Sequence, residues 1–192
     1  TAKQHKLMTP LLVDSDPIVA HTAVQVLVQL KAVDATLAIL DDAKSSPALR
    51  AGAVRVLQSI HEPRVVEALI ARLNKEPAED KRASLLTALC RLHFVDGPWK
   101  GDSWGTRPDT RGPYYQPEPW SETPKIAAAL KTALDQAKST EAVLIGRELA
   151  RHRIPAGAAL DTLIARAATE PTLLPAIAAQ LAQAEEIPAN AI

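Results

Sequence analysis

The feature that most constrains the fold of this chain is an internal repeat of 30 residues. Each copy carries a proline and, six positions later, an alanine: Pro17 and Ala23, Pro47 and Ala53, Pro77 and Ala83. The first two copies, DPIVAHTAVQVLVQL and SPALRAGAVRVLQSI, align without gaps and have apolar residues at helical spacing. A pair of short helices cannot bury both of its apolar faces alone, whereas stacked pairs share one continuous core. The repeat therefore predicts an array of two-helix units.

Helix starts are expected where a capping residue precedes a proline, because the cap satisfies free N–H groups and proline has none to lose. This device occurs at Thr9–Pro10, Asp16–Pro17 and Thr123–Pro124, and Ser139 or Thr140 can cap the following EAVLIGRELARH. The polar opening TAKQHK is expected to be frayed. Gly52 beside Ala53 predicts a close helix crossing, despite a helix-propensity cost of about 1 kcal/mol for glycine.

All six aromatic residues lie between Phe94 and Trp120, in a stretch that also holds four glycines and five prolines. That density of helix and strand breakers excludes any long regular element. The stretch far exceeds the usual connection of about 4–6 residues, and its tryptophans and tyrosines favour order. We expect it to occupy the place of the partner helix in the third repeat and to seal the resulting gap.

The candidate site consists of the aromatic and charged residues of this stretch. They are Trp99, Trp104, Arg107, Asp109, Arg111, Tyr114, Tyr115 and Trp120. Three roles stay open: a structural plug packed on the helices, a docking surface for a partner domain, and a site for a carbohydrate or peptide.

Composition excludes several classes of function. Lys and Arg together number 22, as do Asp and Glu, so the chain lacks the cationic excess typical of nucleic-acid binding. No apolar run approaches the roughly 18 residues of a membrane span. The one cysteine, Cys90, lies in the apolar run LLTALCRL and is expected to be a buried thiol.

The repeats resemble the HEAT-repeat family of α-solenoids, particularly short bacterial HEAT-like repeats with a DPxxRxxAxxxL pattern. Arg50 matches the arginine of that pattern, whereas His21 and Asp80 depart from it. The resemblance implies an all-α fold, a right-handed α-α superhelix with one long aromatic, Pro- and Gly-rich loop insertion. We expect one domain over residues 1–192, with N-terminal repeats at 9–94, an ordered insertion at 95–123 and C-terminal repeats at 124–188.

Some HEAT-repeat proteins are iron hydroxylases that hold metal with His-Glu pairs at equivalent positions of successive repeats. His61-Glu62 is such a pair, but the equivalent positions hold Lys31-Ala32 and Arg91-Leu92. A metal cage cannot form from these residues, so His61-Glu62 is interpreted as a helix-end pair. The other histidines are dispersed, and we expect no catalytic residue, no metal site and no cofactor.

The segment GDSWGTRPDTRGPYYQPEPW resembles a segment found within HEAT repeats of large bacterial proteins of planctomycete type. Those proteins also contain a dehydrogenase-like β-propeller and a c-type cytochrome domain. The resemblance implies an extracytoplasmic setting, the periplasm, with the cytoplasm as the alternative. This chain has no Cys-x-x-Cys-His motif for haem attachment, so any redox role would belong to other domains.

The sequence thus predicts a non-catalytic scaffold or protein-interaction module within a larger extracytoplasmic protein. Its partner would be another protein or a neighbouring domain of the same polypeptide. The alternative is a module that binds a carbohydrate-type ligand at the aromatic stretch and assists a neighbouring oxidoreductase.

Overall fold

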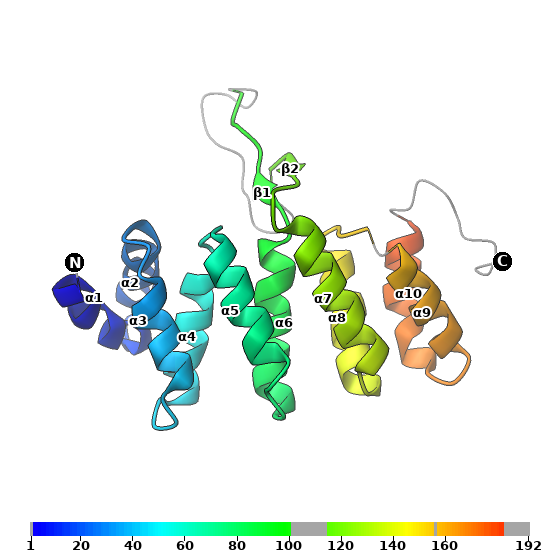
Figure 1. The fold of residues 1–192 in the computed structure, drawn as a ribbon, viewed down its shortest axis with the longest axis horizontal. Helices are drawn as coiled ribbons and strands as arrows, with labels where there is room; N and C mark the ends of the chain where they lie inside the picture. The colour runs from blue at the N-terminus through cyan, green and yellow to red at the C-terminus, as the bar shows by residue number, and fades with distance from the viewer. Residues whose placement is uncertain (1, 101–114, 156, 183–192) are drawn as a thin grey trace. The chain divides into compact units, whose positions relative to one another are not determined.

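The computed structural model describes residues 2–100, 115–155 and 157–182. The chain divides into two compact units, Thr1–Glu76 and Pro77–Ile192. Almost all of the described residues outside turns are helical, which confirms the all-α, solenoid-like fold (Figure 1). The single domain expected over residues 1–192 and the order expected for the insertion stay predictions.

The described part of the N-terminal unit contains helices and the turns between them. Its elements are α1 (Ala2–Met8), the 3-10 helix η1 (Thr9–Val13), α2 (Pro17–Gln29), α3 (Val33–Asp41), α4 (Pro47–Leu57) and α5 (Pro63–Leu73). The four helices from α2 to α5 are the two helix pairs that the 30-residue repeat predicts. The opening residues, expected to be frayed, form α1.

The capping predictions were confirmed in one place and wrong in three. The Asp16 carboxylate accepts a hydrogen bond from a backbone N–H of the first turn of α2, and Pro17 is the first helical residue. Thr9 instead lies in η1, which continues directly from α1, and Ser139 and Thr123 are the first residues of their helices. A capping residue must stand just outside the helix in a non-helical conformation, so these three side chains cannot cap.

Small residues allow close packing within the N-terminal unit, as expected. Ala23 and Ala53 are 2% and 0% exposed, and Gly52 faces Leu12 of η1 so closely that an added Cβ would lie 2.9 Å from the Leu12 Cβ. The close crossing predicted at Gly52 is therefore confirmed. Ala83, the third alanine of the series, is only half-buried, because the third repeat turns its leucines into the core instead.

Arg50 joins α4 to the end of α3. Its guanidinium donates to the backbone carbonyls of Leu40 and Asp42 at that helix terminus, and its Nε donates to the Ser45 carbonyl at 3.2 Å. The last carbonyls of a helix have no partner inside the helix, and their partial negative charge favours a cation. The arginine of the repeat pattern thus caps the preceding helix.

The C-terminal unit is a two-layered helical arrangement with one small β-hairpin. Its described elements are α6 (Glu79–Leu92), β1 (Val95–Asp96), β2 (Pro117–Glu118), α7 (Thr123–Gln136), α8 (Ser139–Arg151), α9 (Ala158–Ala167), η2 (Pro171–Leu173) and α10 (Leu174–Leu181). Helices α6, α8 and α10 pack in one layer and α7 packs against α9 in the other (Figure 1).

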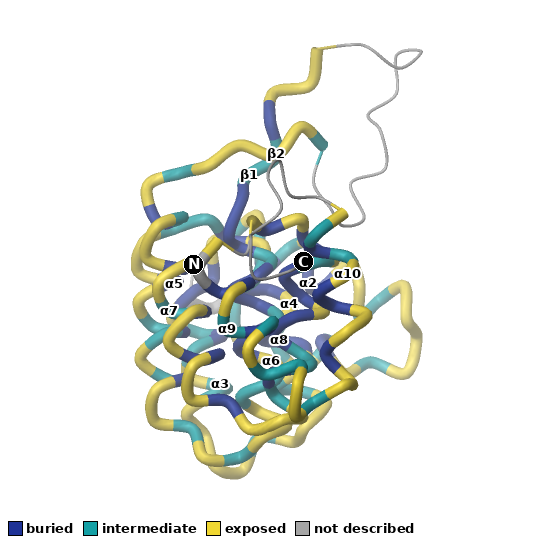
Figure 2. The backbone as a smooth tube through the Cα atoms, turned by 90° about the vertical axis from the view of Figure 1, so that its right-hand side faces the viewer, coloured by how far each residue is buried: buried dark blue, intermediate teal, exposed yellow. Residues whose placement is uncertain are grey.

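The expectation that the insertion replaces a partner helix was wrong. Helix α7, which follows the insertion, packs against α6 and fills that place. The insertion instead lengthens the turn between the two helices of one pair. The chain passes from buried residues at the end of α6 to exposed residues at 98–100 (Figure 2).

Candidate functional site

The two ends of the insertion are held together by a short antiparallel β-hairpin. In this hairpin Val95 pairs with Glu118, and Asp96 pairs with Pro117. The Gly97 N–H donates to the carbonyl of Gln116 at 3.0 Å, and a Cβ at Gly97 would lie 2.5 Å from that same oxygen. Only glycine fits at this close approach of two backbones.

Trp120 anchors the insertion to the end of α6. Its indole Nε1–H donates to the Leu92 carbonyl at 2.8 Å, and the hydroxyl of Thr123 donates to the His93 carbonyl at 2.6 Å. The same hydroxyl oxygen accepts from the Trp120 backbone N–H at 3.0 Å. Carbonyls at a helix C-terminus need partners from outside the helix, so Trp120 and Thr123 together cap α6.

The described residues of the predicted site do not converge on one pocket. Trp120 is the half-buried anchor just described, Tyr115 is half-buried with its backbone N–H donating to the Asp96 carboxylate at 3.2 Å, and Trp99 is 43% exposed. The remaining predicted residues lie outside the described part of the chain: Trp104, Arg107, Asp109, Arg111 and Tyr114. A structural role is observed for Trp120, and the roles of the others stay predictions.

We expect Trp120→Phe to lower the free energy of unfolding by about 1–2 kcal/mol, because it leaves the Leu92 carbonyl without its donor. Trp99→Phe is the matched control, since the Trp99 ring is 43% exposed and caps no helix among the described residues, so its change should stay within about 0.5 kcal/mol. Thermal unfolding followed by circular dichroism measures both. Equal losses in the two variants would show that the indole cap is unimportant.

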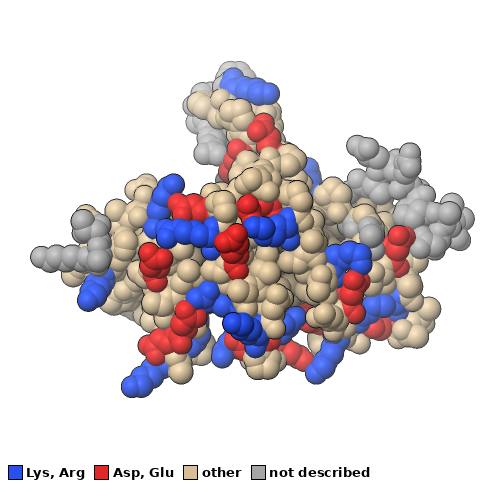
Figure 3. Space-filling model, viewed as in Figure 1, with Lys and Arg blue, Asp and Glu red and all other residues tan. Residues whose placement is uncertain are grey.

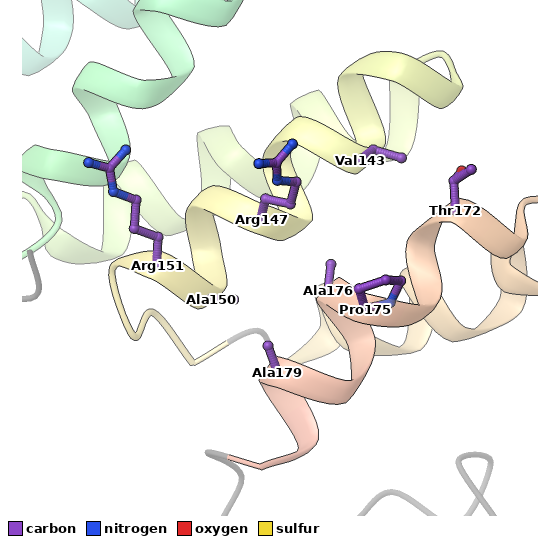
Figure 4. Close-up of a pocket in the computed structure, with 8 residues that line it drawn as sticks. All are labelled: Val143, Arg147, Ala150, Arg151, Thr172, Pro175, Ala176 and Ala179. Atoms are coloured by element: carbon purple, nitrogen blue, oxygen red, sulfur yellow. The ribbon is translucent and has the colours of Figure 1, made fainter.

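A surface groove between α8 and α10 was missed by the sequence analysis. It has a volume of about 600 Å³ and is lined by Val143, Arg147, Ala150, Arg151, Thr172, Pro175, Ala176 and Ala179. Figure 4 shows Val143, Arg147 and Arg151 in succession along α8, with Pro175 and Ala176 on the helix across the groove. We call this surface the α8–α10 groove.

The groove is lined by small side chains, and two arginines give it positive charge. The Gly146 position lets α8 approach α10 closely, since a Cβ there would lie 3.0 Å from the Ala176 Cβ. Arg147 and Arg151 are one helical turn apart and exposed. The four-residue spacing of the two arginines is visible in the sequence and places them on one face of a helix. It indicates a groove only when α10 is known to lie beside that face.

Elsewhere, positive and negative side chains are intermixed. On the face shown in Figure 3, Lys and Arg side chains lie beside Asp and Glu side chains over the described residues. Short pairs of this kind are Arg72 with Asp41 at 2.6 Å and Arg82 with Glu141 at 2.6 Å. The groove differs because, among the residues that the structure describes, its lining includes two cations and no carboxylate.

A buried polar cluster lies beneath the anchored end of α6. His93, Glu148 and His152 are 4%, 8% and 4% exposed, and the His152 Nε2 lies 3.4 Å from the Glu148 carboxylate. Burial, and then the nearby His152, lower the pKa of His93 to about 4. The polar contact with His152 lowers the pKa of Glu148. These groups are closed off from solvent and therefore serve the core.

Cys90 of α6 is fully buried, which confirms the predicted core thiol. Burial raises the pKa of this thiol, and the charge of Glu148 raises it further. A thiol with a raised pKa stays protonated at neutral pH and is a poor nucleophile.

The described residues show neither a metal-binding cluster nor a single membrane-spanning helix. No group of three or more His, Cys, Asp and Glu side chains is placed to hold a metal ion there. Glu62, part of the candidate His61-Glu62 pair, contacts Lys31 at 3.1 Å and Arg64 at 2.9 Å. In the same ranges no single helix is long and apolar enough to cross a bilayer; α2 and α3 qualify only as a pair bent by 120°.

Comparison with known families matches residues 6–90 to the family described as HEAT repeats. The matched region ends within α6, so it covers the first two copies of the 30-residue repeat and the start of the third. HEAT repeats generally mediate protein–protein interactions. No curated protein matches the chain. The HEAT resemblance is thus confirmed for residues 6–90, and the dehydrogenase and cytochrome setting stays a prediction.

Proposed function

We propose that this chain is a non-catalytic scaffold that binds a protein partner, or a neighbouring domain of its own polypeptide, through the α8–α10 groove. The groove carries this proposal: it is open, its lining is mainly apolar, and it lies between two neighbouring helices of one layer. Exposed apolar surface of this kind is typical of interaction sites. The match of residues 6–90 to HEAT repeats supports the same class of function.

The groove suits a peptide segment or helix better than a reaction. The polar residues of its described lining are Arg147, Arg151 and Thr172, and no carboxylate or imidazole is among them. A partner helix would bury apolar side chains against Val143 and Pro175, at roughly 25 cal/mol for each Å² of apolar surface removed from water. Binding without chemistry is therefore the function that the lining supports.

The proposal extends to the setting of the protein. The resemblance of the aromatic insertion supports a place within a larger extracytoplasmic bacterial protein. A second function, binding of a carbohydrate-type ligand at the insertion beside an oxidoreductase domain, is favoured by one described observation, the 43% exposure of Trp99. A flat exposed ring is the surface that binds the apolar face of a sugar.

The test uses peptides selected from a displayed library against the full chain, with their affinities measured by fluorescence polarisation. We expect Ala179→Trp, which fills the groove from the half-exposed Ala179, to weaken binding about tenfold or more. The matched control is Ala178→Trp, on the exposed side of the same helix, which should leave binding unchanged.

Two results would contradict the proposal. One is equal binding by wild type and Ala179→Trp, which would place the peptide elsewhere. The other is loss of peptide binding in Trp99→Ala with Ala179→Trp unaffected, which would assign recognition to the insertion. Saturable binding of a simple sugar panel that Trp99→Ala abolishes would favour the carbohydrate function instead.

A further inference from the structure

We propose that the occupant of the α8–α10 groove is an acidic amphipathic helix, with apolar side chains in the groove and carboxylates on Arg147 and Arg151. This inference rests on the proposed interaction function and adds the chemistry of the partner. Three observations carry it: the charge of the lining, the weak neutralisation of the two arginines, and the match between their spacing and that of a helix.

The charge of the lining has one sign. Arg147 and Arg151 are the only ionised side chains of the described lining, and its remaining residues are apolar or small apart from Thr172. An anionic partner is therefore attracted, whereas a cationic partner meets like charge over an apolar surface. Complementary charge of this kind gives specificity and a fast association rate rather than most of the affinity.

The two guanidinium groups are poorly neutralised by the described part of the chain. Among the described residues Arg147 has no ion pair, and Arg151 contacts Glu148 only at 3.7 Å while its side chain stays 66% exposed. The second oxygen of Glu148 faces His152 inside the core. By contrast, Arg82 and Arg166 of the same unit hold carboxylates at 2.6 and 2.9 Å. Over the described residues, the groove arginines thus keep capacity for carboxylates from a partner.

The spacing of the arginines fits a helical partner. Residues four apart on a helix lie about 5–6 Å from one another, so Glu residues at i and i+4 of a partner match Arg147 and Arg151. From Val143 to Arg151 the groove runs along two turns of α8, roughly 12 Å at 1.5 Å per residue. That length admits two turns of a partner helix and two apolar anchors.

The small residues of the groove leave room for those anchors. Ala150, Ala176 and Ala179 have short side chains and line a groove with a volume of about 600 Å³. Burying one leucine side chain there is worth about 1.5–3 kcal/mol relative to leaving it exposed. Leucines would supply affinity, and the carboxylates would select the partner.

The probe is a fluorescein-labelled helical peptide of about 15 residues, long enough to form an isolated helix, with Leu on one face and Glu at i and i+4 beside it. In the control peptide every Glu is Gln, which preserves size and helix propensity. At about 50 mM NaCl we expect the Glu peptide to bind the full chain about tenfold more tightly than the Gln peptide. At about 500 mM NaCl this advantage should shrink several-fold.

Arg147→Glu combined with Arg151→Glu is expected to remove the preference for the Glu peptide. The matched control is Lys44→Glu combined with Arg55→Glu, two exposed residues of the N-terminal unit that change the net charge equally. Equal affinity of both peptides for the wild type would overturn the acidic partner, as would equal weakening by the two double variants.

The same assay separates this inference from the proposed function. If both peptides bind equally and Ala179→Trp still blocks them, the acidic partner is wrong and the interaction groove stands. If Ala179→Trp leaves both peptides bound, the groove itself is not the interaction site, and both proposals are overturned.

Discussion

Acidification from about pH 7 to about pH 5 is expected to lower the free energy of unfolding of the C-terminal unit by about 2 kcal/mol. His93 is 4% exposed, and its pKa is lowered to about 4 by burial and then by His152. Because an unfolded histidine titrates near 6.5, the unfolded state binds the proton first, and stability falls as pH drops through this window. The loss from His93 reaches about 3 kcal/mol at about pH 4.

Glu148 adds a separate loss at lower pH. Its pKa is lowered from 4.5, so it stabilises the folded state above that value and loses the contribution as pH falls below it. The window between about pH 7 and about pH 5 therefore isolates His93 from Glu148.

Urea unfolding followed by tryptophan fluorescence measures this effect, since all three tryptophans lie in the C-terminal unit. The variant His93→Leu removes the titrating group and keeps apolar bulk, so its stability should be nearly flat over the same window. His21→Gln, at an exposed histidine of α2, should behave as the wild type. An unchanged pH dependence in His93→Leu would contradict the assignment.

Gly52→Val is expected to lower the free energy of unfolding by about 3 kcal/mol. Even a Cβ at this position would lie 2.9 Å from the Leu12 Cβ and 3.3 Å from the Leu12 carbonyl oxygen. Valine adds two more carbons to a site that has no room for the first, and the helix can respond only by moving away from η1. Overpacking of this kind is felt because protein interiors are already close-packed.

The sign of Gly52→Ala is the sharper diagnostic. At an ordinary helical position this change stabilises by about 1 kcal/mol, whereas here the contact with Leu12 should make it destabilising. Ala51→Val, on the exposed side of the same helix, is the control for the propensity of valine. Hydrogen exchange of α2 and α4 locates the effect, and a stabilised Gly52→Ala would show that the crossing is looser than the structure indicates.

The repeat predicted the helical pairs because its information is local and periodic. The proline after Asp16 marks a helix start, and Gly52 beside Ala53 marks a close crossing, without any knowledge of distant residues. The capping role of Thr9 was wrong for the opposite reason. Whether a threonine stands outside a helix or inside one depends on the preceding turn, which the tertiary contacts of α1 and η1 decide.

The pairing of α7 with α6 was not predictable from the breakers between them. Glycines and prolines indicate where a helix ends. Which helix packs against α6 depends instead on contacts with residues that lie 30 positions further along the chain. For that reason the sequence predicted that the insertion replaces the partner helix of α6. That partner helix is α7, which begins at Thr123. The aromatic composition did not predict the role observed for Trp120, whose indole caps the end of α6.

The groove escaped the sequence analysis because it belongs to no single segment. Arg147 and Arg151 look like ordinary solvent-exposed residues of α8, and the alanines of α10 look like core positions. Only their juxtaposition leaves two cations beside an open apolar surface. Buried His93 and Glu148 were missed similarly, since a histidine or glutamate in a helix is most often exposed.

The most direct test of the central claim is an amide-resolved NMR titration of the isotope-labelled full chain with the Glu-containing helical peptide. We expect saturable shift changes concentrated on α8 from Val143 to Arg151 and on Thr172 to Ala179, and their loss in Ala179→Trp. Saturable changes confined to the β1–β2 hairpin and Trp99, or no saturable change at all, would contradict the account.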